Sequence, residues 1–155
     1  MDAFVQPLYE LADFDAIIRQ LKKPGIVQVS GCLDSQKAHF TNGLLREFPF
    51  RLIVAENDLK AKAFYEDFRL YDPEVLYYPA RDLIFYQADI HGNLLTRQRI
   101  QVLRALLERE EVTIVTSIDS CLDCLVPLAV WKEKVIKIRN DSEIDLDRMK
   151  RHLLE

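Results

Sequence analysis

The 155-residue chain has little of what marks an exported, membrane-bound or disulfide-stapled protein. It contains three cysteines, four glycines and one tryptophan. No run of apolar residues approaches the roughly 18 that a membrane-spanning helix needs. The N-terminus also lacks a basic segment followed by an apolar one, which is the pattern of a secretion signal. We therefore expect no membrane span and a location in the reducing cytoplasm.

Two of the cysteines, Cys121 and Cys124, have the Cys-x-x-Cys spacing of some zinc and redox sites. A structural zinc ion needs four ligands, and the sequence offers no second such pair and no paired histidines. Leu122 and Asp123, between the thiols, are also unlike a reactive redox turn. We interpret the pair as half-buried cysteines on a helical turn and predict no metal site.

The charge balance limits the classes of partner. Apolar residues make up 49% of the chain, which is enough for one ordinary core. The formal net charge of −4 argues against a protein that binds nucleic acid over its whole surface. A local basic stripe could follow Arg97, Gln101 and Arg104 on one helix face. Glu108, four residues after Arg104, favours an ordinary solvated face instead.

Apolar residues recur with strand and helix spacing in alternation along the chain. The spacing predicts strands at 26–30, 51–55, 75–78 and 112–116, and helices at 13–23, 36–47, 58–68, 93–110 and 118–125. Strands that alternate with helices in this way form an α/β domain with a parallel sheet and flanking helices. Two predicted helices should each direct four apolar residues to the core: Leu59, Ala63, Phe64 and Phe68 from one, and Ile100, Leu103, Leu106 and Leu107 from the other.

The sequence becomes more charged near the C-terminus. We expect a strand at 135–138, and then a helix that begins with a capping box formed by Ser142 and Asp145. We predict two domains, residues 1–127 and residues 128–155. The second is expected to be the truncated start of another small α/β unit.

A loop after the first predicted strand has the spacing of a phosphate-binding P-loop, GxxxxGK(S/T), with Gly31 and Lys37 in place. Gln36 takes the position of the second glycine, and Ala38 takes that of the metal-binding hydroxyl. Asp34 adds a carboxylate that would repel phosphate. A Cβ at position 36 obstructs the approach of phosphate, and Ala38 has no oxygen for Mg²⁺. We interpret the loop as degenerate and predict no cofactor, although the spacing alone does not distinguish this from a chance match.

Three segments, in order, resemble the N-terminal region of the bacterial transcription-repair coupling factor family, which is similar to the excinuclease B protein. They are residues 29–38, residues 53–68, and an aromatic segment at 78–86 that is followed by a helix. The family motif falls on Tyr78, Pro79, Asp82, Leu83, Tyr86 and Arg99. Asp82 stands where the family more often has glutamate, and Ile84-Phe85 replaces the usual Leu-Pro. The resemblance covers residues 20–155 and argues against a chance match of the loop, so the expected fold is a degenerate P-loop NTPase.

The resemblance implies that the complete protein is an ATP-driven translocase on double-stranded DNA, which displaces stalled RNA polymerase and recruits the excinuclease A protein. For this segment it implies a non-catalytic scaffold. Excinuclease A would bind through the unit that begins near Leu128, and polymerase and DNA through downstream domains. One alternative is an active P-loop ATPase such as excinuclease B itself, against which Gln36 and Ala38 speak. The other is a DNA-binding module, which the acidic charge opposes.

Three further ionisable residues, His39, His91 and Asp119, have no partner at the spacing of an acid-base pair or a metal site. We expect His39 to be solvated or partly packed, His91 to lie in a turn and Asp119 to cap a helix. No catalytic residue is predicted. Arg99 lies beside the apolar side of its helix, which makes it the best candidate for a structural or interface role.

Overall fold

A computed structural model describes residues 4–80, 91–136, 145–147 and 149–150. The chain forms two compact units, Met1–Asp123 and Cys124–Glu155. This division comes a few residues before the boundary expected after residue 127. That the second unit begins a further domain stays a prediction.

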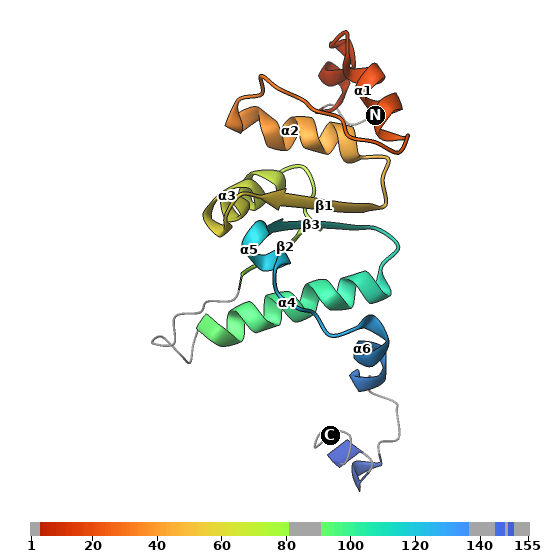
Figure 1. The fold of residues 1–155 in the computed structure, drawn as a ribbon, viewed down its shortest axis with the longest axis vertical. Coiled ribbons are helices and arrows are strands. Elements are labelled where there is room, and N and C mark those ends of the chain that lie inside the picture. Colours follow the sequence, from red (N-terminus) through yellow and green to blue (C-terminus); the bar gives the residue numbers. More distant parts are fainter. Residues whose placement is uncertain (1–3, 81–90, 137–144, 148, 151–155) are drawn as a thin grey trace. The chain divides into compact units, whose positions relative to one another are not determined.

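The first unit is built on a three-stranded parallel sheet. Its spatial order is β1 (Phe50–Ala55), β3 (Val112–Ser117) and β2 (Leu76–Tyr78), as Figure 1 shows. The central strand β3 is buried at every position. Three of its six residues are apolar, and the other three, Thr113, Thr116 and Ser117, are buried with their hydroxyl groups hydrogen-bonded. The predicted α/β class, with a parallel sheet and flanking helices, is confirmed. A relation to P-loop NTPases stays a prediction.

Two helices cover opposite faces of the sheet: α3 (Asp58–Phe68) and α4 (His91–Glu108). Asn57 begins α3, because its side chain accepts a hydrogen bond from the backbone N–H of Lys60. Successive strand residues point to opposite faces, so the strands contribute to two separate core clusters. The α3 cluster contains Ala38, Ala61, Phe68, Val75, Tyr77 and Val115. The α4 cluster contains Leu76, Tyr78, Val102, Ala105, Val112 and Ile114.

The N-terminal elements pack around a third apolar cluster. They are the 3₁₀ helix η1 (Gln6–Glu10), α1 (Phe14–Leu21) and α2 (Asp34–Leu45). Gly43 lets α2 approach the other two closely, because a Cβ at this position would overlap the Leu8 side chain and lie 3.0 Å from Phe14 Cζ. The cluster contains Val5, Leu8, Phe14 and Ile18, with Phe40 and Leu44 packed against it.

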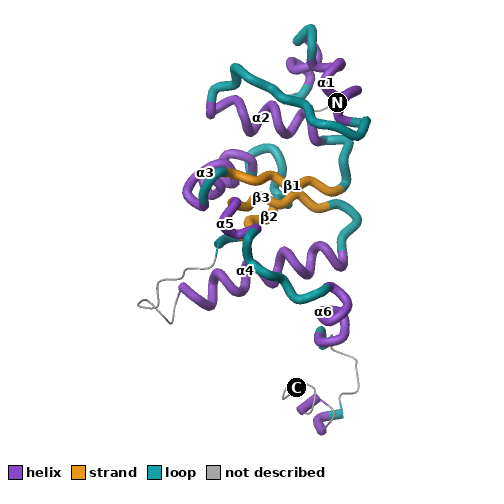
Figure 2. The backbone as a smooth tube through the Cα atoms, in the orientation of Figure 1, coloured by secondary structure: helices purple, strands orange, loops and turns teal. Residues whose placement is uncertain are grey.

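The predicted strand at residues 26–30 is wrong. This segment is an irregular loop, drawn in teal in Figure 2, and Ile26 is 98% exposed. A strand needs a neighbouring strand to satisfy its backbone groups, and β1 pairs only with β3 in the described part of the chain. β1 is therefore an edge strand, and its Phe50, Leu52 and Val54 side chains are 46–62% exposed.

Some predicted helix faces are also wrong. Leu59 is 80% exposed, and Ala61 takes the core position in α3. In α4, Ile100 and Leu106 are exposed, while Val102 is buried. The short helix α5 (Ile118–Cys121) ends earlier than expected.

The second unit contains α6 (Leu128–Lys134), a helix that the sequence pattern does not predict. Pro127 is its N-cap residue, and the helix has no side-chain capping hydrogen bond there. The predicted strand at 135–138 is wrong for Val135 and Ile136, which follow α6 as irregular chain, and 137–138 lie outside the described residues. A helical turn follows Asp145, whose carboxylate accepts a hydrogen bond from the Asp147 backbone, whereas Ser142 lies outside the described residues.

Candidate functional site

The degenerate loop is shorter than the sequence predicts. Helix α2 begins at Asp34, two residues before the expected start, so Gln36 and Lys37 belong to its first turn. Gly31 has a φ of +88°, a left-handed conformation that favours glycine, and thus keeps the sharp turn of the motif. The Gln36 side-chain oxygen accepts a hydrogen bond of 3.2 Å from the Leu33 backbone N–H. The Gln36 side chain therefore helps to cap the N-terminus of α2.

The positive charge of Lys37 is neutralised by Asp34 in the same helical turn. Lys37 Nζ lies 2.5 Å from Asp34 Oδ1, and both side chains are largely exposed. The hydrogen bond from Lys37, and then its positive charge, hold the pKa of Asp34 below its usual range. A phosphate at this loop would have to displace the carboxylate and then remain close to it.

Ala38 occupies a core position. It is 2% exposed and packs in the cluster shared with Ala61 and Phe68 of α3. A hydroxyl at this position would be buried among apolar atoms. The small Ala38 side chain thus fills a core position between α2 and α3.

A second polar cluster, which the spacing of residues does not predict, lies where the parallel strands end. Asp58 Oδ1 accepts hydrogen bonds from the Ala80 backbone at 3.1 Å and from Ser117 Oγ at 3.4 Å. The Ser117 hydroxyl lies 2.9 Å from that of Ser120, and Tyr77 donates to the Asp58 backbone oxygen. Burial, and then the hydrogen bond to Asp58, raise the pKa of Tyr77. Ligands of open α/β sheets bind at this edge, but here Asp58 joins the three strand ends to one another.

Two of the predicted motif residues, Tyr78 and Pro79, contact a third, Arg99. Its Nη1 donates a 2.9 Å hydrogen bond to the Pro79 carbonyl oxygen, and its guanidinium lies 4.2 Å from the centre of the Tyr78 ring. The same nitrogen lies 2.8 Å from Asp123 Oδ2, and the Arg99 side chain is only 7% exposed. Arg99 therefore ties the end of β2 to Asp123, the last residue of the first unit. Asp82, Leu83 and Tyr86 lie outside the described residues.

The other ionisable candidates from the sequence are His39, Asp119 and His91. His39 is partly packed, as predicted: its Nε2 lies 2.5 Å from the Phe4 carbonyl oxygen and its ring stacks on Tyr71. The helix cap assigned to Asp119 is wrong, because Ser117 accepts the hydrogen bond from the backbone of the first turn. His91 begins α4.

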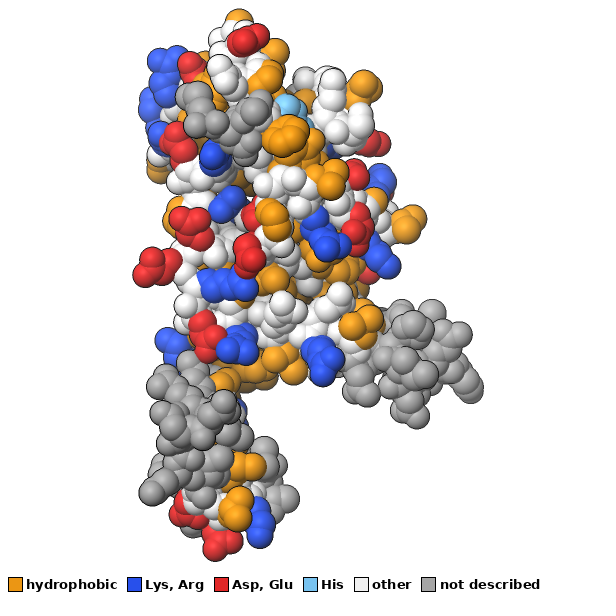
Figure 3. Space-filling model, turned by 180° about the vertical axis from the view of Figure 1, so that it is seen from behind, with side chains coloured by type: hydrophobic (Ala, Val, Ile, Leu, Met, Phe, Trp, Pro, Cys, Tyr) orange, Lys and Arg blue, Asp and Glu red, His pale blue; other side chains and the backbone are white. Residues whose placement is uncertain are grey.

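The helix-face stripe is solvated, as predicted, and Arg104 pairs with Glu108 at 2.8 Å. On the face of the molecule in Figure 3, basic and acidic side chains are interspersed, without a broad area of one sign. Such a surface offers no continuous track for nucleic-acid phosphates.

The predicted half-burial of Cys121 and Cys124 is wrong, since both thiols are exposed. The one-turn helix α5 buries Ser120 instead of its cysteine. Within the described ranges, no three His, Cys, Asp or Glu side chains gather where they could hold a metal ion. The helices in those ranges include none with both the length and the apolar character needed to cross a membrane.

No protein-family model matches the chain. Over 124 residues, 78% of its length, the chain is 25% identical to the transcription-repair-coupling factors of two Staphylococcus epidermidis strains. The matched region spans 11% of the length of these relatives. The finding supports a distant relationship to transcription-repair-coupling factors, while the similarity to the excinuclease B protein stays a prediction.

Proposed function

We propose that this chain is the non-catalytic N-terminal scaffold module of a transcription-repair coupling factor, and that it supports the recruitment of the excinuclease A protein. The proposal rests on the distant similarity to transcription-repair-coupling factors and on the state of the degenerate loop. The observation that carries it is the pairing of Lys37 with Asp34 in the first turn of α2.

This pairing opposes nucleotide binding in two ways. Lys37 is held by a carboxylate of its own helix turn, and a phosphate that displaced this carboxylate would stay beside it. Two unit charges about 4 Å apart repel by roughly 4 kcal/mol at an effective dielectric near 20, which is about a thousandfold in affinity. Ala38 supplies no oxygen that could hold Mg²⁺ and offset the repulsion. An active ATPase is therefore the weaker hypothesis for the loop.

As a scaffold, the module would carry the unit that follows it in the chain. Arg99 supports this role, because it anchors Asp123, the residue at which the first unit ends, to the carboxyl end of β2. In the longer protein, excinuclease A would bind through the following unit. ATP-driven movement on double-stranded DNA and contact with RNA polymerase would belong to downstream domains.

The test measures binding of purified excinuclease A, by biolayer interferometry, to the longer protein that carries this module. Arg99→Ala should weaken the binding severalfold, because the end of the first unit is released. Arg104→Ala is the matched control, since Arg104 lies on the same helix but is exposed, and it should bind as the unchanged protein does. If both variants bind excinuclease A as tightly as the unchanged protein does, the proposed scaffold role is wrong.

A further inference from the structure

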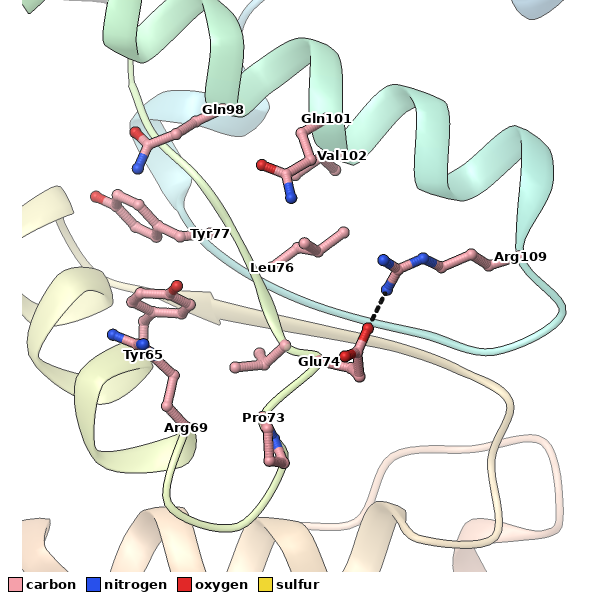
Figure 4. Close-up of a pocket in the computed structure, with 11 residues that line it drawn as sticks. Tyr65, Arg69, Pro73, Glu74, Leu76, Tyr77, Gln98, Gln101, Val102 and Arg109 are labelled. Atoms are coloured by element: carbon pink, nitrogen blue, oxygen red, sulfur yellow. Dashed lines mark ion pairs between the residues drawn. The ribbon is translucent and has the colours of Figure 1, made fainter. Parts of the chain in front are cut away.

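We draw no further inference here: the strongest candidate, the polar pocket of about 330 Å³ between α3 and α4 (Figure 4), carries none, because the adjoining strand β2 is buried and both arginines of the lining are already paired with glutamates, so that nothing among the described residues selects an occupant.

Discussion

Substitution of Arg99 by alanine is the most demanding test of how the first unit is held together. The change removes a hydrogen bond to the Pro79 carbonyl, an ion pair with Asp123 and a stacked contact on Tyr78. A hydrogen bond to a charged group contributes about 1.5–3 kcal/mol, and a desolvated cation–π contact adds up to about 2 kcal/mol. Breaking a buried ion pair costs about 3–5 kcal/mol. Because the Asp123 side chain is 29% exposed, we expect the low end of that range, about 3 kcal/mol.

The assay is urea unfolding followed by circular dichroism at 222 nm. Arg104→Ala provides the comparison, because Arg104 lies on the same helix with a 74% exposed side chain. Its pair with Glu108 is of the i,i+4 kind, which contributes about 0.3–0.5 kcal/mol. A cycle with Asp123→Asn then isolates the ion pair from the contacts to Pro79 and Tyr78. A free energy of unfolding for Arg99→Ala within about 0.5 kcal/mol of that for Arg104→Ala would show that Arg99 does not hold the unit together.

Three further predictions address the packing and the loop. Ala38→Thr, which restores the hydroxyl of a P-loop, should lower the free energy of unfolding by about 1–3 kcal/mol because it buries a polar group in a packed site, and urea midpoints will show whether it does. Gly43→Ala should fail to give the roughly 1 kcal/mol that alanine gains over glycine inside a helix, since the added methyl meets Leu8 and Phe14; a full gain in the same measurement would contradict the close approach of α2. The low pKa of Asp34 means that its contribution to stability is present above the unfolded-state pKa and is lost as pH falls through the folded value. Lys37→Met should therefore raise the NMR titration midpoint of Asp34, and no change would show that the pair is absent in solution.

The sequence is most informative where local pattern and tertiary packing agree. The helix at 58–68 is predicted at its observed bounds, because Asn57 caps it and Phe68 ends it inside the core. The strands at 51–55 and 112–116 are found within one residue, since both are short runs rich in β-branched and apolar residues. A structural role for Arg99 is predicted because it lies beside the apolar side of its helix. In the structure it contacts three residues: Asp123, Pro79 and Tyr78.

The sequence-based predictions fail where the structure of a segment depends on which other elements of the fold lie beside it. The apolar segment at 26–30 has strand composition, but no described strand lies beside it, and composition cannot supply one. Leu59 fits a helical apolar stripe, yet the sheet meets α3 through Ala61, because close packing selects the small residue. The contacts of Asp58 and Asp123 cannot be predicted from the spacing of residues, because their partners come from strands and helices far away in the sequence.

Thermal unfolding of the chain in millimolar MgATP will show whether the loop has lost its nucleotide chemistry. A ligand present at a hundred times its dissociation constant stabilises the folded state by about 2.7 kcal/mol, which raises the melting temperature by roughly 5–10 °C for a domain of this size. We expect the same melting temperature with MgATP as with magnesium and inorganic triphosphate. A saturable rise with MgATP that Lys37→Ala abolishes, and that substitution of the exposed Lys62 by alanine leaves intact, would show that the loop still binds nucleotide.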